Sequence, residues 1–418
     1  MKPGYKQTEG GVIPEAWEVK TLGSLTTLLT NGFVGTATTA YVESEDGVLY
    51  IQGYNVQENG FNFHGIKRVS KAFHARNKKS CLQTGDLLTI QTGDIGVTTV
   101  VPSELDGANC HALIISRLRK QESEPGYYCQ YFNSERGRVA FKEIETGTTM
   151  KHLNGGDMKR LFLPSPPVEE QRAIATALSD VDGLLGGLDR LIAKKRDLKQ
   201  AAMQQLLTGQ TRLPGFHGDW EVKRLGEVLC KGRLGGNYPN QDSETEYPLM
   251  KMGNIARGSI DLSKIEYIPA GLVPELQHKL SKGDVLFNTR NTLDLVGKVG
   301  IWRDELPLAY YNSNLMRLEF DPRYVCSNEF ANAALNTSSA ISVLRGLATG
   351  TTSVAAIYTR DLLGMPFSVP PLFEQTAIAT VLTDMDAELG ALEQRLAKTR
   401  ALKLGMMQEL LTGRTRLV

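Results

Sequence analysis

The chain has 418 residues, with 47 lysines and arginines against 46 aspartates and glutamates, so its net charge of +1 excludes a polycation and any nucleic-acid surface must be a local concentration of charge. This length is typical of two or three domains that each bury a core. No stretch reaches the ~18 apolar residues of a membrane helix, and the N-terminal MKPGYKQTEG lacks the apolar core of a signal peptide, so we expect a cytoplasmic protein with no membrane contact.

The first predicted domain, residues 1–165, combines strands and turns with some helix. GVLYIQGYNV and GDLLTIQTGDIGVTTVV are β-branched runs broken by Gly, Asp and Asn, which indicates short strands joined by tight turns. Between Glu58 and Asp86 there is no acidic residue, while cations accumulate beside Phe61 and Phe63. The candidate DNA-binding cations of this patch are Lys67, Arg68, Lys71, Arg76, Lys78 and Lys79. A solvated charged face is the alternative interpretation, because charge runs often mean only that.

A long helix is predicted over residues 166–212. It follows a Pro-Pro pair, which cannot extend a helix backwards, and it carries Glu169 and Glu170 in its first turn. Gly209 fits the left-handed residue that follows a helix C-terminus. Apolar residues at alternating spacings of four and three are typical of a coiled-coil seam, here Ile174, Leu178, Val181, Leu185, Leu188 and Ile192.

The second predicted domain, residues 213–369, has the same mixture of strand and turn, for example in GDVLFNTRNTLDLVGKVGIW. Arginine and lysine hold phosphates and read guanine edges, and asparagine reads adenine edges. The candidate DNA-binding residues of this domain are Lys251, Asn254, Arg257, Asn288, Arg290, Asn291 and Lys298. For each asparagine taken singly, turn chemistry is the competing interpretation.

Residues 370–418 predict a second long helix that repeats the first. Residues 166–213 align on residues 370–417 without a gap, at a constant offset of 204 (370 minus 166). This helix also follows a Pro-Pro pair, carries Glu374 in its first turn and ends at Gly413. Its predicted seam is Ile378, Leu382, Met385, Leu389, Leu392 and Leu396.

Similarity outside the helices extends the repeat to whole domains. WEVKTLGSL at 17 matches WEVKRLGEV at 220, and TGTT at 146 matches TGTT at 349. A unit of roughly two hundred residues is too long for a solenoid, whose repeats span about 20–50 residues. The predicted fold class is therefore α/β: two globular α/β domains separated by two long helices that form an antiparallel coiled coil, with internal pseudo-twofold symmetry.

Antiparallel pairing would make the chain a closed two-part ring, because the end of the second helix would return to the start of the first domain. A helix of about 40 residues is about 60 Å long, which is long enough to act as a spacer. Gly186 and Gly390 occupy equivalent positions inside the helices, where we expect a close approach of backbones.

Catalytic motifs are missing from the sequence. There is no Walker lysine loop, no GxGxxG after a strand, no HExxH and no GxSxG, and the five cysteines show no zinc spacing. The stretch from Ser165 to Val168 is similar to the Pro-Pro loop with which amino-methyltransferases hold a flipped base. That loop needs an aromatic fourth residue, and here the fourth residue is Val168, or Leu372 in the second copy. We therefore expect no catalysis, metal or cofactor in this chain.

Three features together resemble the specificity (S) subunit of Type I restriction-modification enzymes, along essentially the whole chain. They are the paired PP-x-x-EQ-x-x-IA helices ending in LLTG, the W-E-V-K-x-L-G openings, and GDVLFNTRNTLDLVGKVG with TGTTSVAAI. The resemblance implies two target-recognition domains, each reading one half of a bipartite double-stranded DNA site. GDLLTIQTGDIG lacks an arginine equivalent to Arg290, so no base-reading role is carried over to Gln91 or Thr92.

The resemblance also implies partners and their cofactors. The helices would set the spacer and dock a pair of methyltransferase (modification) subunits, and restriction/translocase subunits would join them. S-adenosylmethionine would bind the methyltransferase subunits, and ATP and Mg the restriction subunits. The chain by itself would be non-catalytic.

Three other functions stay open. A stand-alone two-domain DNA-binding regulator would use the same helices and basic patches, but it would need no docked subunit. A complete methyltransferase would show activity of the purified chain with labelled S-adenosylmethionine. An assembly scaffold without DNA contacts would lack the steep salt dependence of DNA binding.

Overall fold

The computed structural model describes residues 3–8, 11–147 and 151–417, and the chain divides into two compact units. Unit 1 comprises residues 1–190 and 394–418, and unit 2 comprises residues 191–393. The predicted domain limits follow the chain, whereas these units follow contacts in space. Each long helix therefore contributes residues to both units.

Unit 1 holds short strands and helices between residues 5 and 165. Its strands are β1 (Tyr5–Thr8), β2 (Gly11–Pro14), β3 (Glu18–Thr21), β4 (Thr26–Asn31), β5 (Val48–Ile51), β6 (Val56–Gln57), β7 (Gly60–Phe61), β8 (Lys67–Val69), β9 (Leu87–Ile90), β10 (Thr98–Val100), β11 (Asn109–Cys110), β12 (Leu113–Leu118) and β13 (Phe162–Ser165). Its short helices are α1 (Leu22–Leu25), α2 (Lys71–Arg76), α3 (Pro125–Asn133), α4 (Glu135–Ile144) and α5 (Gly155–Lys159). Side-chain caps begin several of these helices: Ser70 caps α2, Ser134 caps α4 and Asn154 caps α5.

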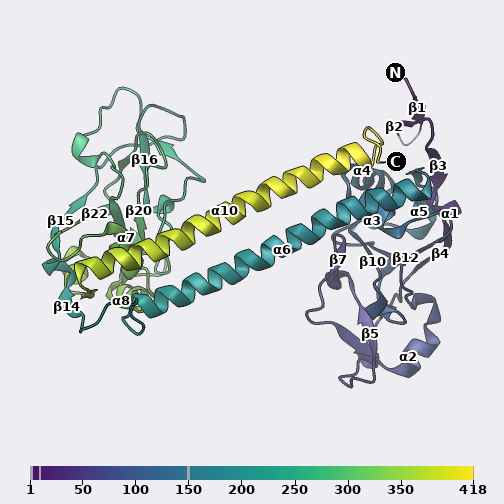
Figure 1. Cartoon of the computed structure of the whole chain (residues 1–418), viewed down its shortest axis with the longest axis horizontal. Helices are drawn as coiled ribbons and strands as arrows, with labels where there is room; N and C mark the ends of the chain where they lie inside the picture. The colour runs from purple at the N-terminus through teal and green to yellow at the C-terminus, as the bar shows by residue number, and fades with distance from the viewer. Residues whose placement is uncertain (1–2, 9–10, 148–150, 418) are drawn as a thin grey trace. The chain divides into compact units, whose positions relative to one another are not determined.

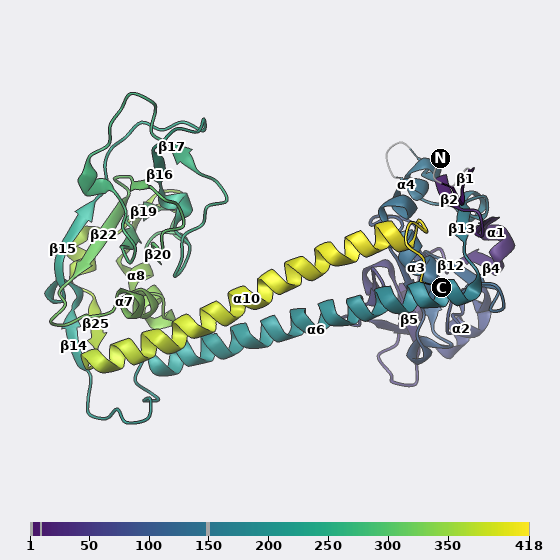
Figure 2. The same ribbon diagram turned by 45° about the horizontal axis from the view of Figure 1, so that its top comes forward.

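Unit 2 repeats this plan between residues 221 and 369. Its strands are β14 (Glu221–Arg224), β15 (Leu229–Leu234), β16 (Pro248–Met250), β17 (Glu266–Tyr267), β18 (Val285–Asn288), β19 (Arg290–Asn291), β20 (Val299–Ile301), β21 (Tyr310–Tyr311), β22 (Leu315–Phe320), β23 (Thr349–Gly350), β24 (Ala355–Ala356) and β25 (Pro366–Val369). Its short helices are α7 (Asn328–Leu335), α8 (Ser338–Leu347) and α9 (Thr359–Leu363). Helix α7 packs against β20 (Figure 2).

Three sheets of unit 1 correspond strand for strand to sheets of unit 2. The antiparallel order β10-β9-β12-β4 of unit 1 recurs in unit 2 as β20-β18-β22-β15. The small sheet β11-β5-β8, with its parallel β11–β5 pair, recurs as β21-β16-β17 with a parallel β16–β21 pair. The ladder of β13 with β3 recurs as β25 with β14, and unit 2 also has the sheet β19-β24-β23. This correspondence confirms the predicted α/β class and the duplication of the domain.

The two long helices are α6 (Val168–Leu206) and α10 (Leu372–Leu410), each 39 residues long (Figure 1). Gly209 and Gly413 follow them with φ of 70° and 68°, which confirms the predicted left-handed residue at each C-terminus. The expected backbone approach at the helix glycines is wrong. A Cβ on Gly186 would meet only the Arg190 side chain of the same helix, and a Cβ on Gly390 would meet no atom within 4 Å.

In unit 1 the beginning of α6 and the end of α10 run antiparallel (Figure 1). The Lys403 ammonium lies 2.5 Å from the Asp182 carboxylate, and the Arg400 guanidinium lies 3.3 Å from Asp189. The number of the α6 residue therefore rises as that of its α10 partner falls.

In unit 2 the same two ion pairs recur with the helices exchanged. Lys199 pairs with Asp386, and Arg196 lies 2.5 Å from Glu393. Each of these residues stands 204 positions from its counterpart in unit 1 (for example, 386 minus 182). The antiparallel direction predicted for the helices is thus present within each unit, and the twofold relation between the halves stays a prediction.

All twelve predicted seam residues are buried or half-buried. Ile174 and Leu178 belong to the core of unit 1, together with the end of α10, and Ile378 and Leu382 belong to the core of unit 2, together with the end of α6. The ends of each stripe therefore pack on a domain as well as on the other helix. None of the described helices is both long and apolar enough to cross a membrane.

The first turn of each long helix is anchored by a buried carboxylate. In unit 1 Glu170 is 0% exposed and accepts hydrogen bonds from the Trp17 indole (2.9 Å) and the Arg416 guanidinium (2.6 Å). In unit 2 Glu374 is 0% exposed and accepts from Trp220 (3.1 Å) and Arg212 (2.5 Å). The Glu of the repeated motif thus ties each helix start to the opening tryptophan of its domain.

The glutamine that follows each anchoring glutamate forms hydrogen bonds with backbone groups. The Gln171 amide accepts from the Glu124 N–H and donates to the carbonyl of Pro166, the first of the two prolines before α6. Gln375 likewise accepts from the Cys326 N–H and donates to the carbonyl of Pro370, the first of the two prolines before α10. Both glutamines are 0% exposed, and they satisfy backbone groups that would otherwise be buried without partners.

Candidate nucleic-acid interface

The predicted cation patch of unit 1 lies on β8, α2 and the turn after α2. Five of its six cations are exposed, and none of these five makes an ion pair with another described residue: Lys67, Lys71, Arg76, Lys78 and Lys79. Arg68 differs from them. Its half-buried guanidinium donates to the carbonyl oxygens of Glu45 (3.1 Å) and Gly47 (2.7 Å), so it supports the turn before β5. DNA contact by this patch stays a prediction.

The aromatic residues near the patch have different surroundings. Phe73 is buried, and its ring meets Phe33 edge-on at 4.9 Å and Tyr50 at 5.8 Å, so it holds α2 on the small sheet. Phe61 and Phe63 stack on each other with ring centroids 5.9 Å apart, and Phe63 is exposed. The patch is therefore an exposed cationic surface on an aromatic core.

Two of the predicted asparagines of unit 2 bind the nearby backbone: Asn254 ends a short 3-10 helix, and Asn288 ends β18. Asn254 is 5% exposed, accepts from the Lys251 N–H (2.9 Å) and donates to the Asp261 carbonyl (2.9 Å). Asn288 is 0% exposed and accepts from the Arg290 N–H at 3.3 Å. The structure thus gives both amides the turn chemistry that competed with base reading in the sequence, and no DNA contact is tested for either.

Some of the remaining predicted DNA-binding residues of unit 2 lie beside an acidic side chain, and others do not. The Lys251 ammonium lies 2.6 Å from Glu266. Hydrogen bonds from Ser263, and then the charge of Lys298, lower the pKa of the Asp261 carboxyl, so Lys298 also faces an acid. Arg290 and Asn291 form β19, where Arg290 is exposed opposite Ala356 of β24.

Arg257 has no such acid. It is exposed at the mouth of a cleft of about 660 Å³, and its side chain makes no hydrogen bond or ion pair with a described residue. Burial, and then the positive charge of Arg345, lower the pKa of the Arg257 guanidinium. Arg345 is a residue that sequence reasoning missed, because it lies in the apolar α8 sequence with no other charge near it in the chain.

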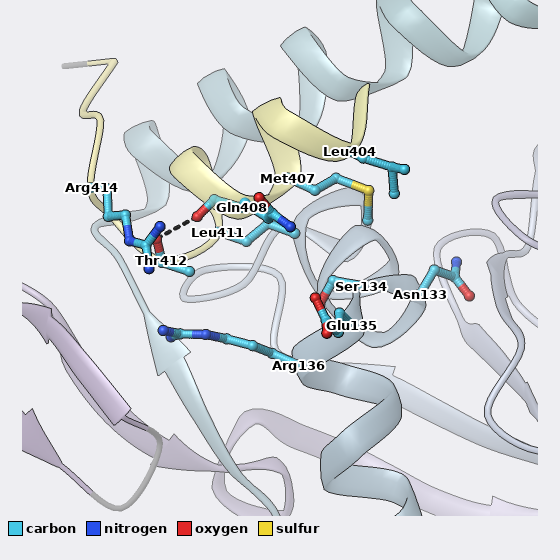
Figure 3. A pocket seen from close by; sticks show the side chains of 10 residues that line it. All are labelled: Asn133, Ser134, Glu135, Arg136, Leu404, Met407, Gln408, Leu411, Thr412 and Arg414. Carbon is cyan, nitrogen blue, oxygen red and sulfur yellow. Dashed lines mark hydrogen bonds between the residues drawn. The ribbon is translucent and has the colours of Figure 1, made fainter. Parts of the chain in front are cut away.

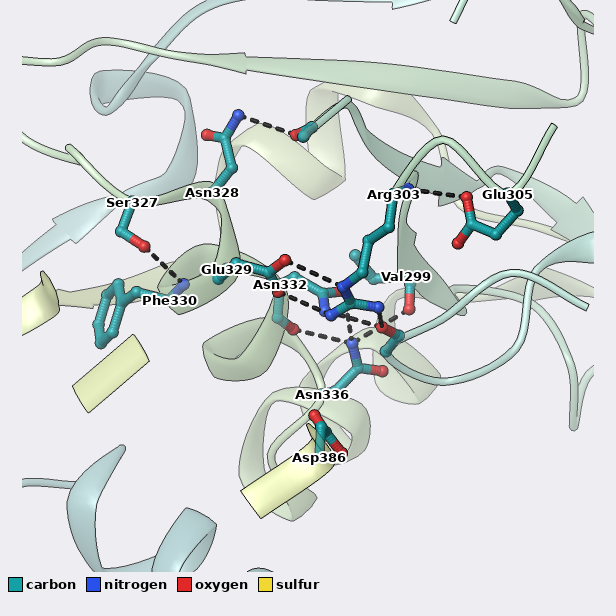
Figure 4. Close-up of polar contacts among 12 residues, drawn as sticks. Val299, Arg303, Glu305, Ser327, Asn328, Glu329, Phe330, Asn332, Asn336 and Asp386 are labelled. Carbon is teal, nitrogen blue, oxygen red and sulfur yellow. Dashed lines mark hydrogen bonds and ion pairs between the residues drawn. The ribbon is translucent and has the colours of Figure 1, made fainter. Parts of the chain in front are cut away.

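Other cations in this cleft are neutralised. The Arg303 guanidinium makes two hydrogen bonds to the Glu329 carboxylate, of 3.0 and 2.7 Å (Figure 4). Asn332 and Asn336 donate to the Gly258 and Val299 carbonyls beside it. These contacts join α7 to the strand-and-loop side of the cleft and leave no acid free for Arg257.

A smaller cavity of about 300 Å³ lies in unit 1, between the start of α4 and the end of α10 (Figure 3). Leu404 and Met407 of α10 form its apolar wall with Leu411, which directly follows the helix, and Arg136 of α4 lies on the other side. The Arg136 Nη1 atom is buried without a hydrogen-bond partner. An apolar wall of this kind does not suit a nucleic-acid backbone.

Three of the five cysteines, Cys81, Cys110 and Cys129, are buried or half-buried. Burial raises the pKa of the Cys129 thiol to about 12 and raises that of Cys81, so both are protonated near neutral pH. Cys110 is buried, and the neighbouring His111 accepts or donates a hydrogen bond at Nδ1 with the Tyr50 hydroxyl (3.0 Å). Within residues 3–8, 11–147 and 151–417 no group of three or more His, Cys, Asp or Glu is placed to hold a metal.

The sequence as a whole matches one family model. It is described as the Type I restriction modification DNA specificity domain, and it matches twice, over residues 14–192 and 217–399. Each match spans one domain and most of the long helix that follows it, in agreement with the repeat.

Curated relatives match over nearly the whole chain. The MjaVIII specificity subunit of a type I restriction enzyme from Methanocaldococcus jannaschii is 24% identical, over 99% of this chain and 96% of that protein. The EcoKI specificity subunit of Escherichia coli K12 is 20% identical, over 96% of this chain and 89% of that protein.

Solved structures show the same fold. The S subunit of a Type I restriction-modification system from M. genitalium matches with a TM-score of 0.59 and 17% identity, over 98% of this chain and 99% of that one. A chain from a structure of type I restriction-modification complex assembly matches with a TM-score of 0.55 and 18% identity, over 96% of this chain and 99% of that one.

Proposed function

This chain belongs to the Type I restriction modification DNA specificity family, and on that premise we propose that it is the DNA sequence-recognition subunit of a Type I restriction-modification complex. Each domain reads one half of a bipartite double-stranded DNA site. The observation that carries this is the duplicated frame: the two units share sheets, anchors and helix contacts, but differ in their exposed charges. One geometry holding two different surfaces fits the reading of two different half-sites.

The long helices serve as spacer and docking rod in this proposal. A pair of methyltransferase subunits docks on them, and restriction/translocase subunits join the assembly. Exposed leucines support docking of protein on the long helices, because large apolar side chains in water are typical of binding surfaces. They are Leu184, Leu191 and Leu198 on α6, and Leu402 and Leu404 on α10.

The chemistry belongs to the partner subunits. This chain carries no motif for S-adenosylmethionine, ATP or Mg, so we place the first on the methyltransferase subunits and the other two on the restriction subunits. The relatives described above are named specificity subunits, which agrees with a chain that is non-catalytic by itself. They do not support a stand-alone regulator. A cytoplasmic location follows from the same assignment.

The function is tested by methylation mapping. The chain is co-expressed with the methyltransferase subunit encoded beside it in an unmethylated host, and methyladenine is mapped across the host DNA by long-read sequencing. We expect a split motif with a fixed gap that appears only when both proteins are present. Methylation that does not change with this chain, while both proteins are folded, would contradict the proposal.

A further inference from the structure

The connection that follows the buried strand β18 is longer in unit 2 than its counterpart in unit 1. In unit 1 seven residues, 91–97, join β9 to β10. In unit 2 ten residues, 289–298, join β18 to β20, which are the corresponding strands. Because the surrounding sheet recurs in both units, the difference is local: three residues are added to one loop of unit 2.

The first residue of each connection is fixed by the same backbone hydrogen bond. The Gln91 carbonyl accepts from the Leu153 N–H at 3.0 Å, and the Thr289 carbonyl accepts from the Ile357 N–H at 3.0 Å. Gln91 and Thr289 are therefore equivalent, and the additional residues of unit 2 come after Thr289.

In unit 2 the longer connection is joined to a second loop. We call residues 289–296 and 349–356 the paired loops. Strand β19 of the first loop pairs antiparallel with β24 of the second (Figure 2). The Leu293 N–H also donates to the Thr352 carbonyl at 3.2 Å. Backbone bonds thus hold the two loops together before any ligand binds, which lowers the entropy cost of binding.

Arg290 is the one cation of the paired loops, and it is exposed. Its side chain makes no hydrogen bond or ion pair with any residue in the described part of the chain. Asp294, the one acid of the two loops, is exposed as well. In unit 1 the residue after Gln91 is Thr92, so a cation occupies this position in unit 2 and not in unit 1.

Exposed apolar side chains lie on the same loops. Leu293 is 38% exposed, Leu295 is 40% exposed and Val354 is 67% exposed. One cation with three exposed apolar side chains differs from a phosphate-binding surface, which gathers several cations. Base edges in the major groove instead offer hydrogen-bond acceptors beside apolar groups such as the thymine methyl. The paired loops therefore suit base edges better than the phosphate backbone.

We propose that the paired loops enter the major groove of the half-site read by unit 2, and that Arg290 binds a guanine there. The planar guanidinium group presents two parallel donors that match O6 and N7 of guanine. The major groove admits a two-stranded β-ribbon, so β19 and β24 fit it. This proposal rests on the proposed function and names a residue that determines the sequence of one half-site.

The test uses the complex assembled with its methyltransferase subunit. Fluorescence anisotropy compares the wild-type chain with Arg290→Gln on duplexes in which each base pair of the mapped site is changed in turn. We expect Arg290→Gln to bind the mapped duplex about 10–100-fold more weakly. At one guanine the variant should bind the original and the changed base pair with equal affinity, while every other position keeps its preference. This guanine should lie in the half-site that changes when residues 220–369 are exchanged.

A base analogue tests the contact at a single atom. Deazaguanine has a carbon in place of N7 and still pairs with cytosine. Placed at the identified guanine, it should weaken binding of the wild-type complex about 10-fold, because a hydrogen bond to a charged donor is lost. Binding of the Arg290→Gln complex should not change.

A matched control uses an arginine that already has an acid. Arg323 is exposed and lies 2.5 Å from Asp321, so Arg323→Gln should keep the wild-type affinity and base preferences. Thermal melting shows that each variant is folded, and Arg290→Gln should melt at the wild-type temperature because its side chain has no internal partner.

Several outcomes would overturn the guanine contact. It is refuted if the half-site of unit 2 contains no guanine on either strand, or if Arg290→Gln keeps the wild-type affinity and base preferences. Equal weakening on the mapped and a shuffled duplex, with a salt slope smaller by about 1, would show a phosphate contact instead. Loss of the methyltransferase subunit from a folded variant would show that the loops bind protein. If the wild-type complex itself shows no preference for the mapped site, the proposed function fails.

Discussion

Single charges in this chain recur with their partners in both domains. Asp86 is 1% exposed and accepts two hydrogen bonds of 2.8 Å from Arg117, along with one from the Gln83 N–H. Asp284 stands at the equivalent position, accepting from Arg317 and the Ser281 N–H. The Gly-Asp pair of each domain is therefore a structural element that holds the turn before a buried strand.

Removing the Asp86 carboxylate should destabilise unit 1. Asp86→Ala leaves the Arg117 guanidinium without its acid, and breaking a buried pair in this way costs about 2–3 kcal/mol when one partner is partly exposed. Urea unfolding of the full chain, followed by tryptophan fluorescence, measures this loss. Asp94→Ala removes an exposed aspartate from the following loop and should cost less than about 0.5 kcal/mol. Equal effects of the two changes would refute this account.

Acid pH should weaken unit 1 through His111. Burial lowers the pKa of this imidazole below its ordinary 6.5, and its Nδ1 hydrogen-bonds the Tyr50 hydroxyl. Below pH 6.5 the imidazole of His111 therefore binds a proton in the unfolded chain more readily than in the folded chain. The free energy of unfolding consequently decreases as the pH falls. We expect the melting temperature of the wild-type chain to drop between about pH 7 and pH 5.5, and His111→Gln to reduce that drop. An unchanged pH profile in the variant would show that His111 does not contribute.

At the scale of elements, the long helices follow from the sequence and their contacts follow from the fold. The heptad-like spacing and the glycine after each helix give α6 and α10 their extent. The buried anchors Glu170 and Glu374 then fix where each helix starts relative to its own domain. Each helix is thus a rod whose beginning is held rigidly by a tryptophan and an arginine.

A longer helix should change the spacer of the DNA site. Four residues inserted into α6 add about 6 Å, and a base pair takes about 3.4 Å, so the unread gap should alter by about one or two base pairs. Methylation mapping with the variant chain measures the gap directly. If the gap keeps its length while the variant still methylates DNA, the helices do not act as a ruler.

At the scale of the whole molecule, the duplication makes the two domains exchangeable. Residues 220–369 carry both strands of the β14–β25 ladder, so an exchange at these limits leaves that ladder intact. Replacing this segment by the second domain of another specificity subunit should change one half of the recognised site and leave the other half as it is. The substitute must keep the tryptophan at its start, because Trp220 binds Glu374 outside the segment. Changes in both halves of the mapped motif would contradict modular recognition.

The sequence by itself determined the duplication, the α/β class, the presence of two long helices that follow Pro-Pro pairs, and the absence of recognisable catalytic motifs. Repeats, helix periodicity and turn residues are local signals, and each can be read along the chain without knowing what lies beside it. The left-handed Gly209 and Gly413 were predictable for this reason, and so was the start of α6 and α10 after Pro-Pro pairs.

Only the tertiary structure decided which polar groups are free. Asn254 and Asn288 are of a residue type that reads adenine edges, but their amides hydrogen-bond nearby backbone groups. Arg257 lines a cleft whose acids Glu329 and Asp386 already pair with Arg303 and Lys199, and these pairings appear only in the folded chain. Whether a charged side chain is free to bind a ligand depends on all the groups around it in space. Sequence spacing does not show which groups these are.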